Sequence, residues 1–243
     1  MTKVVILSGG RGSRLSEYTG ECPKPMIMVC GKPILQRIIE TFIVGGFTEF
    51  IIPTGYLGGK VRSYFRENYT FVEEHESELI VKRDSIVIRV VDTGQDTLTG
   101  GRILRLKKYL TEPFMMTYGD GLCNINPRFV KELGEEIGKN IITAVHPIPR
   151  FGGMTISPDM AVLSFHEKEV NNNAWINAGF MYLLPTVLGY ISGDYCNFEK
   201  DVLPRICWDG NLYAFQYSGV FRPIDTMSDL DDAKDMVRMG VLK

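Results

Sequence analysis

The chain has 243 residues, of which 44% are hydrophobic and 23% are charged, as is usual for a globular protein with a substantial core. Its formal net charge of -2 argues against a nucleic-acid-binding surface, so any cationic site must be local. The five cysteines are scattered, and no apolar run approaches the ~20 residues of a membrane span. We therefore expect a cytoplasmic protein with reduced thiols and with neither a nucleic-acid nor a membrane partner.

Short apolar runs alternate with amphipathic runs from the N-terminus to about residue 147. The first run, Lys3–Leu7, predicts a buried parallel strand, and Pro33–Phe42 predicts a helix that Gly45 ends. Further strands are expected at 50–53, 87–91, 114–118 and 140–145, further helices at 60–66 and 103–110, and an edge hairpin or excursion at 69–85. This alternation predicts an α/β fold with a parallel sheet and crossover helices.

The second half of the chain has less helix between its strands. Strands are expected at 154–156, 162–165, 178–184, 212–217 and 221–224, and helices at 198–207 and 229–239. No repeat, low-complexity tract or linker separates the two halves. We expect one continuous domain over 1–243, with an alternating half at 1–147 and a mixed half at 148–243.

A glycine-rich run, Leu7–Leu15, follows the first predicted strand. Glycines there let backbone N–H groups approach phosphate oxygens that a side chain would obstruct. Arg14 and Lys24 supply cations that neutralise phosphate charge. The run is neither a Walker P-loop nor a complete dinucleotide fingerprint. It indicates a nucleoside triphosphate site, and the alternative is a tight connection without a ligand.

Two aspartates follow predicted strands. Asp120 lies between two glycines at the carboxyl end of 114–118, and Asp225 lies between a late strand and the last helix. Open α/β sheets bind ligands at such strand ends, and a divalent cation on a triphosphate needs few but convergent carboxylates. Alternatively, Asp120 is a turn residue and Asp225 a helix N-cap.

Three further positions carry groups suited to anions or amides. Thr99–Arg102 precedes a predicted helix, whose N-terminal amides and Arg102 favour an anionic or carbonyl group. Lys168 and Asn177 stand at a strand end and a strand start; taken separately, they are a solvated lysine and a turn residue. The three histidines share no spacing with a nucleophile, and we assign them no catalytic role.

Taken together, these motifs resemble the sugar nucleotidyltransferases, and among them the glucose-1-phosphate cytidylyltransferases. The similarity runs from about Lys3 to Asp225. It is carried by the glycine-rich run, by Lys24–Met26, and by Val91–Gly94, Thr99–Arg102, Thr117–Gly121, Arg150–Gly152 and Ile176–Asn177 in that order. The resemblance implies a Rossmann-like, mixed but mostly parallel sheet flanked by helices. It also implies a nucleotide-binding half at 1–147, an acceptor-binding half at 148–243, and a homo-oligomer.

The resemblance also implies roles for individual residues. CTP would be bound by Leu7, Gly9, Gly10, Gly12, Ser13, Arg14, Lys24, Thr99, Arg102, Tyr118 and Gly119. The catalytic residues would be Arg14, Lys24 and Asp120, with Asp120 and Asp225 holding Mg²⁺. The acceptor would be bound by Lys168, Asn177 and Glu199.

The implied reaction joins CMP from CTP to a phosphorylated acceptor and releases pyrophosphate. We expect the acceptor to be α-D-glucose 1-phosphate, giving a CDP-linked product for polysaccharide biosynthesis. Departures from the family pattern at Glu169, Ala178 and Phe198 lie on the acceptor side. They motivate an alternative acceptor, namely another sugar, a polyol phosphate or an acyl phosphate. A silent nucleotide-sensing domain is a third hypothesis, disfavoured by the presence of Lys24, Asp120 and Asp225.

Overall fold

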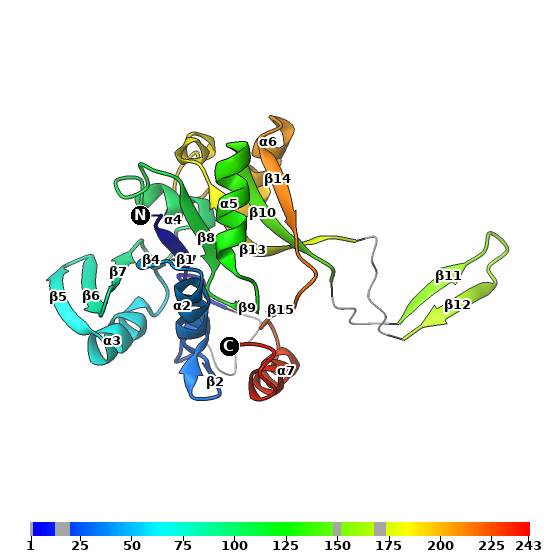
Figure 1. The fold of residues 1–243 in the computed structure, drawn as a ribbon, viewed down its shortest axis with the longest axis horizontal. Helices are drawn as coiled ribbons and strands as arrows, with labels where there is room; N and C mark the ends of the chain where they lie inside the picture. The colour runs from blue at the N-terminus through cyan, green and yellow to red at the C-terminus, as the bar shows by residue number, and fades with distance from the viewer. Residues whose placement is uncertain (1, 13–19, 148–151, 168–173) are drawn as a thin grey trace.

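A single nine-stranded sheet organises the chain in the computed structural model, which describes residues 2–12, 20–147, 152–167 and 174–243 (Figure 1). In sheet order the strands are β14 (Leu212–Gln216), β10 (Asn140–Val145), β13 (Ile176–Leu183), β8 (Phe114–Tyr118), β1 (Val4–Leu7), β4 (Glu49–Thr54), β7 (Ile86–Asp92), β6 (Glu78–Arg83) and β5 (Thr70–His75). All except β6 and β13 run in one direction, since every antiparallel pair in the sheet includes one of these two strands and the other pairs are parallel. The predicted mixed, mostly parallel sheet is confirmed.

Helices cover both faces of the sheet. They are α2 (Ile34–Val44), α3 (Gly58–Asn68), α4 (Thr99–Arg105), α5 (Pro127–Ile137), α6 (Leu203–Trp208) and α7 (Met227–Arg238), with the 3₁₀ turns η2 (Lys24–Met26) and η3 (Pro185–Tyr190) and the π-helical turn η4 (Phe198–Val202). Val4 and Ile6 of β1 pack in one core with α2, α3 and α5, whereas Val5 and Leu7 pack in a second core with α4, η3 and α6. Strand β1 is therefore apolar throughout because both of its faces are buried.

Helix α4 begins earlier than predicted. The sequence placed Thr99–Arg102 before a helix at 103–110, but these four residues form its first turns and the helix ends at Arg105. Gly100 and Gly101 lie directly against the backbone of Asp194 and Cys196, where a Cβ would overlap. Glycine is needed at these two positions because another segment packs on the helix there.

Smaller pairs complete the fold. Strand β9 (Gly121–Cys123) pairs with β15 (Phe221–Pro223), and β2 (Met28–Val29) pairs with β3 (Lys32–Pro33). The first of these joins residues about a hundred positions apart and brings the loops after β8 and β15 together. Among the described residues, no helix combines the length and apolar composition needed to cross a membrane.

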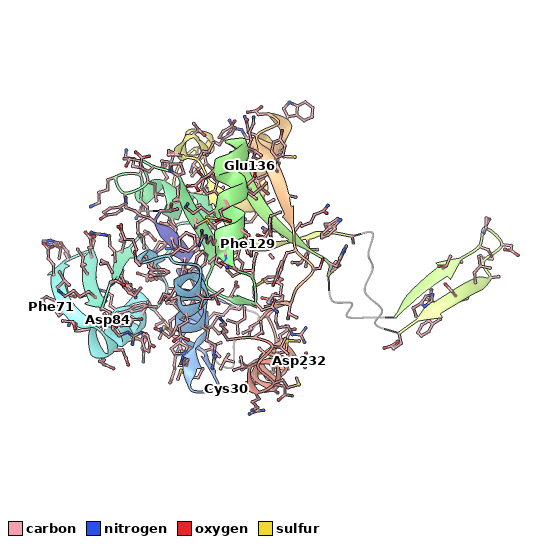
Figure 2. All side chains as sticks on the ribbon, in the orientation of Figure 1. Cys30, Phe71, Asp84, Phe129, Glu136 and Asp232 are labelled. Carbon is pink, nitrogen blue, oxygen red and sulfur yellow. The ribbon has the colours of Figure 1, made fainter. Side chains whose placement is uncertain are left out.

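A two-stranded hairpin, β11 (Gly153–Ile156) with β12 (Val162–His166), lies away from the central sheet (Figure 1). Its apolar side chains are gathered and exposed, including Met154 at 58%, Leu163 at 67% and Phe165 at 59%. By contrast, Phe71 on β5 and Phe129 on α5 are single exposed residues far apart on the body (Figure 2). Isolated surface apolar residues are ordinary, whereas a contiguous patch marks a contact surface.

Candidate active site

The candidate site lies where β1 and β8 end side by side. The two strands are parallel, with Leu7 opposite Tyr118, so the loops that follow them leave the sheet at the same edge. Gly119 donates its backbone N–H to the Leu7 carbonyl at 2.9 Å, and a Cβ on Gly119 would crowd that oxygen and the Ser8 hydroxyl. The glycine therefore allows the two loops to approach each other.

A cavity of about 370 Å³ opens at this edge. The predicted site residues that line it are Leu7, Gly9, Gly10, Gly12, Lys24, Thr99, Arg102, Tyr118, Gly119, Asp120 and Asp225. Sequence reasoning missed Ser8, Pro25, Thr97, Leu98 and Asn197, which also line it. All five lie within two residues of a predicted one in the sequence, Asn197 being two residues from Glu199.

Some of the predicted site residues cannot be placed. Ser13, Arg14 and Lys168 lie outside the described residues, as does Glu169, one of the departures on the acceptor side. Their assignments stay predictions.

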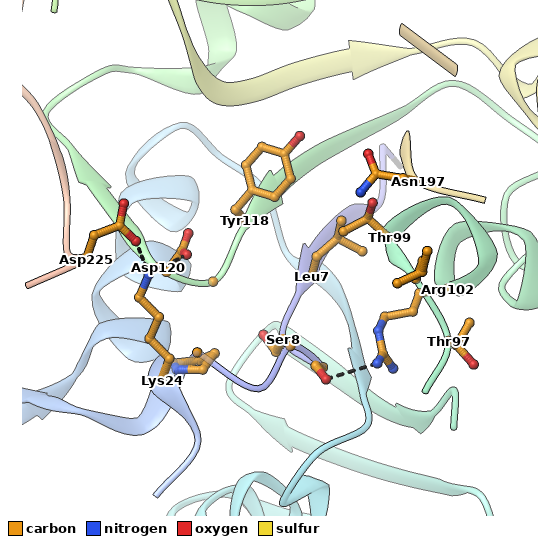
Figure 3. A pocket seen from close by; sticks show the side chains of 16 residues that line it. Leu7, Ser8, Lys24, Thr97, Thr99, Arg102, Tyr118, Asp120, Asn197 and Asp225 are labelled. Atoms are coloured by element: carbon orange, nitrogen blue, oxygen red, sulfur yellow. Dashed lines mark hydrogen bonds and ion pairs between the residues drawn. The ribbon is translucent and has the colours of Figure 1, made fainter. Parts of the chain in front are cut away.

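Lys24 joins the two predicted metal ligands. Its Nζ donates to Asp120 Oδ2 at 2.8 Å and to Asp225 Oδ1 at 2.7 Å (Figure 3). Although burial opposes a charge on Lys24, the two carboxylates outweigh it and raise the pKa of the ammonium. The lysine is charged, and two carboxylates that are far apart in the sequence share one cation.

This carboxylate pair suits Mg²⁺. Both side chains present an oxygen to a common point, and Mg²⁺ is usually bound by one or two carboxylates with substrate phosphates and waters. Asp225 does not cap α7, because Thr226 is the N-cap and forms a capping box with Asp229. The alternative interpretation of Asp225 as a helix cap is therefore wrong. Asp120 and Asp225 would hold the ion, which would supply positive charge beside the phosphates.

Arg102 holds the glycine-rich segment in place. Its guanidinium donates five hydrogen bonds of 2.8 to 3.2 Å, to the carbonyls of Gly9, Thr54, Gly94 and Gln95 and to the Thr93 hydroxyl. A Cβ on Gly9 would overlap the guanidinium. Burial lowers the pKa of Arg102, and the hydrogen bonds compensate for that burial. A direct contact between Arg102 and a nucleotide stays a prediction.

The acceptor-side residues lie near Tyr118. Glu199 Oε2 accepts a hydrogen bond from the Thr99 hydroxyl at 2.8 Å, and Thr99 Oγ1 accepts one from the Phe198 N–H at 2.9 Å. Asn177 is exposed, and its Oδ1 accepts from the Gly179 N–H at 2.7 Å. Thr99, which was predicted to bind the nucleotide, is thus hydrogen-bonded to Glu199, which was predicted to bind the acceptor.

Comparison with known proteins identifies the family. A model of the nucleotidyl transferase family matches residues 3–235. A Salmonella typhi protein named glucose-1-phosphate cytidylyltransferase is 38% identical over 238 residues, covering 93% of this chain and 92% of that protein. A Bacillus subtilis protein named probable glucose-1-phosphate cytidylyltransferase is 36% identical over 248 residues, covering 98% of this chain and 97% of that protein.

Solved structures share the fold. HddC from Yersinia pseudotuberculosis superposes with a TM-score of 0.73 at 26% identity, covering 98% of this chain and 100% of that one. The same protein has been solved complexed with GMP-PN. A UDP-glucose pyrophosphorylase complexed with UDP-glucose has a TM-score of 0.73 at 16% identity, covering 99% of both chains, and shows the fold alone.

Proposed function

This chain belongs to the nucleotidyl transferase family, and on that premise we propose that it transfers CMP from CTP to α-D-glucose 1-phosphate, giving a CDP-linked sugar and pyrophosphate. The choice of base and acceptor rests on the Salmonella typhi and Bacillus subtilis relatives. The match with this chain extends over at least 92% of the length of each relative. The observation that carries the chemistry is the convergence of Lys24, Asp120 and Asp225 beside the glycine-rich segment.

The reaction is an in-line displacement at phosphorus. A phosphate oxygen of the acceptor forms a bond to the α-phosphorus of CTP, and the bond to the bridging oxygen of pyrophosphate breaks. Catalysis of this kind depends on positioning and charge stabilisation, without a covalent intermediate. Lys24 supplies a fixed positive charge at the edge of β1 and β8. Backbone N–H groups of the glycine-rich segment would bind the phosphates, and Asp120 and Asp225 would hold Mg²⁺.

We also propose a cytoplasmic homo-oligomer. All five cysteines are unpaired, and Cys30 and Cys207 are exposed, which suits a reducing compartment. The exposed apolar face of the β11–β12 hairpin supports association, because a lone two-stranded hairpin is marginally stable in water.

The direct test is pyrophosphate release with CTP and Mg²⁺, with glucose 1-phosphate run beside other sugar phosphates, polyol phosphates and acyl phosphates. We expect turnover with glucose 1-phosphate, and loss of that turnover in Asp120→Asn, which removes the charge of a metal ligand. Asp84→Asn is the control, because Asp84 lies in an exposed turn of the β6–β7 hairpin (Figure 2). Turnover with only another acceptor would overturn the glucose assignment. Unchanged turnover in Asp120→Asn would remove Asp120 from the metal site.

A further inference from the structure

Two buried polar atoms at the candidate site have no hydrogen-bond partner. Among the described residues only three buried side-chain polar atoms are unsatisfied, and two of them are the Tyr118 hydroxyl and Glu199 Oε1. Leaving such a group unpaired costs about 1–3 kcal/mol, and unsatisfied groups in native proteins call for an explanation. Their presence together indicates a place prepared for polar groups of a ligand.

The Tyr118 ring is fixed by its neighbours. It lies at the end of β8, and its face packs against Gly179 of β13, where a Cβ would come within 2.6 Å of Tyr118 Cδ2. Gly179 also has a φ of 84°, which disfavours any side chain there. The Tyr118 hydroxyl points away from Lys24 and Ser8 (Figure 3). The phenol is thus directed away from the groups that neutralise the triphosphate.

The Glu199 carboxylate is also fixed. The Thr99 hydroxyl holds Oε2 at 2.8 Å, which leaves Oε1 as the oxygen without a partner. The Tyr118 hydroxyl lies close to the side chains of Glu199 and Asn177, yet it completes no hydrogen bond. A hydroxyl donor without a partner therefore lies beside a carboxylate oxygen without a partner.

We propose that Tyr118 determines acceptor specificity, its hydroxyl and Glu199 Oε1 together binding one hydroxyl group of the acceptor sugar. The phenol donates a hydrogen bond to the sugar oxygen, and Oε1 accepts a hydrogen bond from the sugar O–H. The proposal rests on the proposed function, and it assigns Tyr118 to the acceptor site instead of the nucleotide site. A site built to bind a hydroxyl group rejects an analogue that lacks it, because its own buried groups are then left unpaired.

The test combines one variant with a series of substrates. Tyr118→Phe removes only the hydroxyl, and kcat/KM is measured with glucose 1-phosphate and its 2-, 3-, 4- and 6-deoxy analogues. We expect the variant to lose about 10- to 100-fold in kcat/KM for glucose 1-phosphate. With one of the deoxy analogues, the wild type should have a low kcat/KM, and Tyr118→Phe should lower it no further. The substrate and the enzyme have then each lost a partner of the same interaction. The Kd of CTP, measured by calorimetry, should not change.

Tyr109→Phe is the matched control. Tyr109 is another tyrosine beside a glutamate, but its hydroxyl has a partner, donating to Glu78 Oε2 at 3.0 Å. It does not line the cavity, so kcat/KM should be unaffected. If the Kd of CTP rises in Tyr118→Phe by as much as kcat/KM falls, Tyr118 binds the nucleotide and the proposal is wrong. Equal discrimination by variant and wild type against all four analogues would also overturn the proposal. Failure of the proposed function looks different, since the wild type would then turn over none of these sugars.

Discussion

Lys24 is the residue at which distant parts of the chain meet. The side chain is only 9% exposed and contacts Asp120 and Asp225, which come from the loops after β8 and β15. One ammonium between two carboxylates leaves this group of three with excess negative charge. That excess favours a divalent cation, and the ammonium competes with the cation for the same oxygens.

This competition predicts the effect of Lys24→Met on metal binding. Without nucleotide, the variant should bind Mn²⁺ at least about tenfold more tightly than the wild type, because the competing positive charge is gone. Its affinity for CTP should fall, since a phosphate-neutralising cation is lost. Electron paramagnetic resonance of free Mn²⁺ measures the first effect and calorimetry the second.

Lys32→Met is the control for charge alone, because Lys32 is exposed and pairs only with Glu40 among the ion pairs of the described residues. It should leave Mn²⁺ binding unchanged. Equal Mn²⁺ affinity in Lys24→Met and the wild type would show that Lys24 does not shield the carboxylates.

At the scale of elements, helix α4 positions the segment after β1. Its first turns carry Arg102, whose guanidinium bonds to carbonyls after β1, β4 and β7. The helix approaches closely enough because Gly100 and Gly101 pack on the backbone of 194–196. The three strand ends are thus joined by one side chain, and the shape of the phosphate-binding segment depends on a helix that is distant in sequence.

A double-mutant cycle tests this dependence. Gly9→Ala places a methyl group on the Arg102 guanidinium, and Arg102→Met removes the guanidinium. Each single change should weaken CTP binding, with Arg102→Met also lowering the free energy of unfolding by about 2–3 kcal/mol because buried carbonyls lose their donors. In the Arg102→Met background, Gly9→Ala should cost much less than in the wild type.

Gly10→Ala is the control for the glycine, because a Cβ on Gly10 meets nothing within 4 Å. Its effect on stability should not depend on Arg102. Additive effects of Gly9→Ala and Arg102→Met would mean that Arg102 does not act through the Gly9 segment.

At the scale of the whole molecule, one sheet carries residues predicted to bind the nucleotide and residues predicted to bind the acceptor. Strands from 1–147 and from 176–216 alternate at its β14 end, in the order β14-β10-β13-β8, so the predicted division into two halves at 147/148 describes the order of the chain and not two separate sheets. The β11–β12 hairpin pairs with no strand of this sheet and lies away from it (Figure 1). Its Met154 lies opposite Phe165, so these apolar side chains share one face.

The exposed apolar face of the β11–β12 hairpin predicts that the protein associates through this hairpin. Leu163→Glu combined with Phe165→Glu should lower the molar mass measured by size exclusion with light scattering to that of a single chain, because charges on a buried contact face disfavour association. Phe71→Glu changes an exposed phenylalanine on β5 and should leave the mass unchanged. A wild type that is already monomeric, or a double variant that stays associated, would contradict the assignment.

The sequence by itself determined the local features of this protein. Lys3–Leu7 read as a buried strand, the glycines after it as a phosphate-binding turn, and the two aspartates as residues at strand ends, because these properties depend on composition and spacing within a few residues. The boundaries of α4 were not predictable, because its glycines are required by contact with a segment about ninety residues away in the sequence.

Tertiary structure alone decided which groups meet. Lys24 contacts Asp120 and Asp225, which are 96 and 201 residues away in the sequence. Arg102 donates hydrogen bonds to backbone carbonyls, and the Tyr118 hydroxyl lies close to Glu199. Sequence pattern gives a residue's place on a strand or loop, whereas the direction of its side chain follows from what packs around it. Here that packing comes from pairs of strands that lie far apart in the sequence, β8 with β13 and β9 with β15.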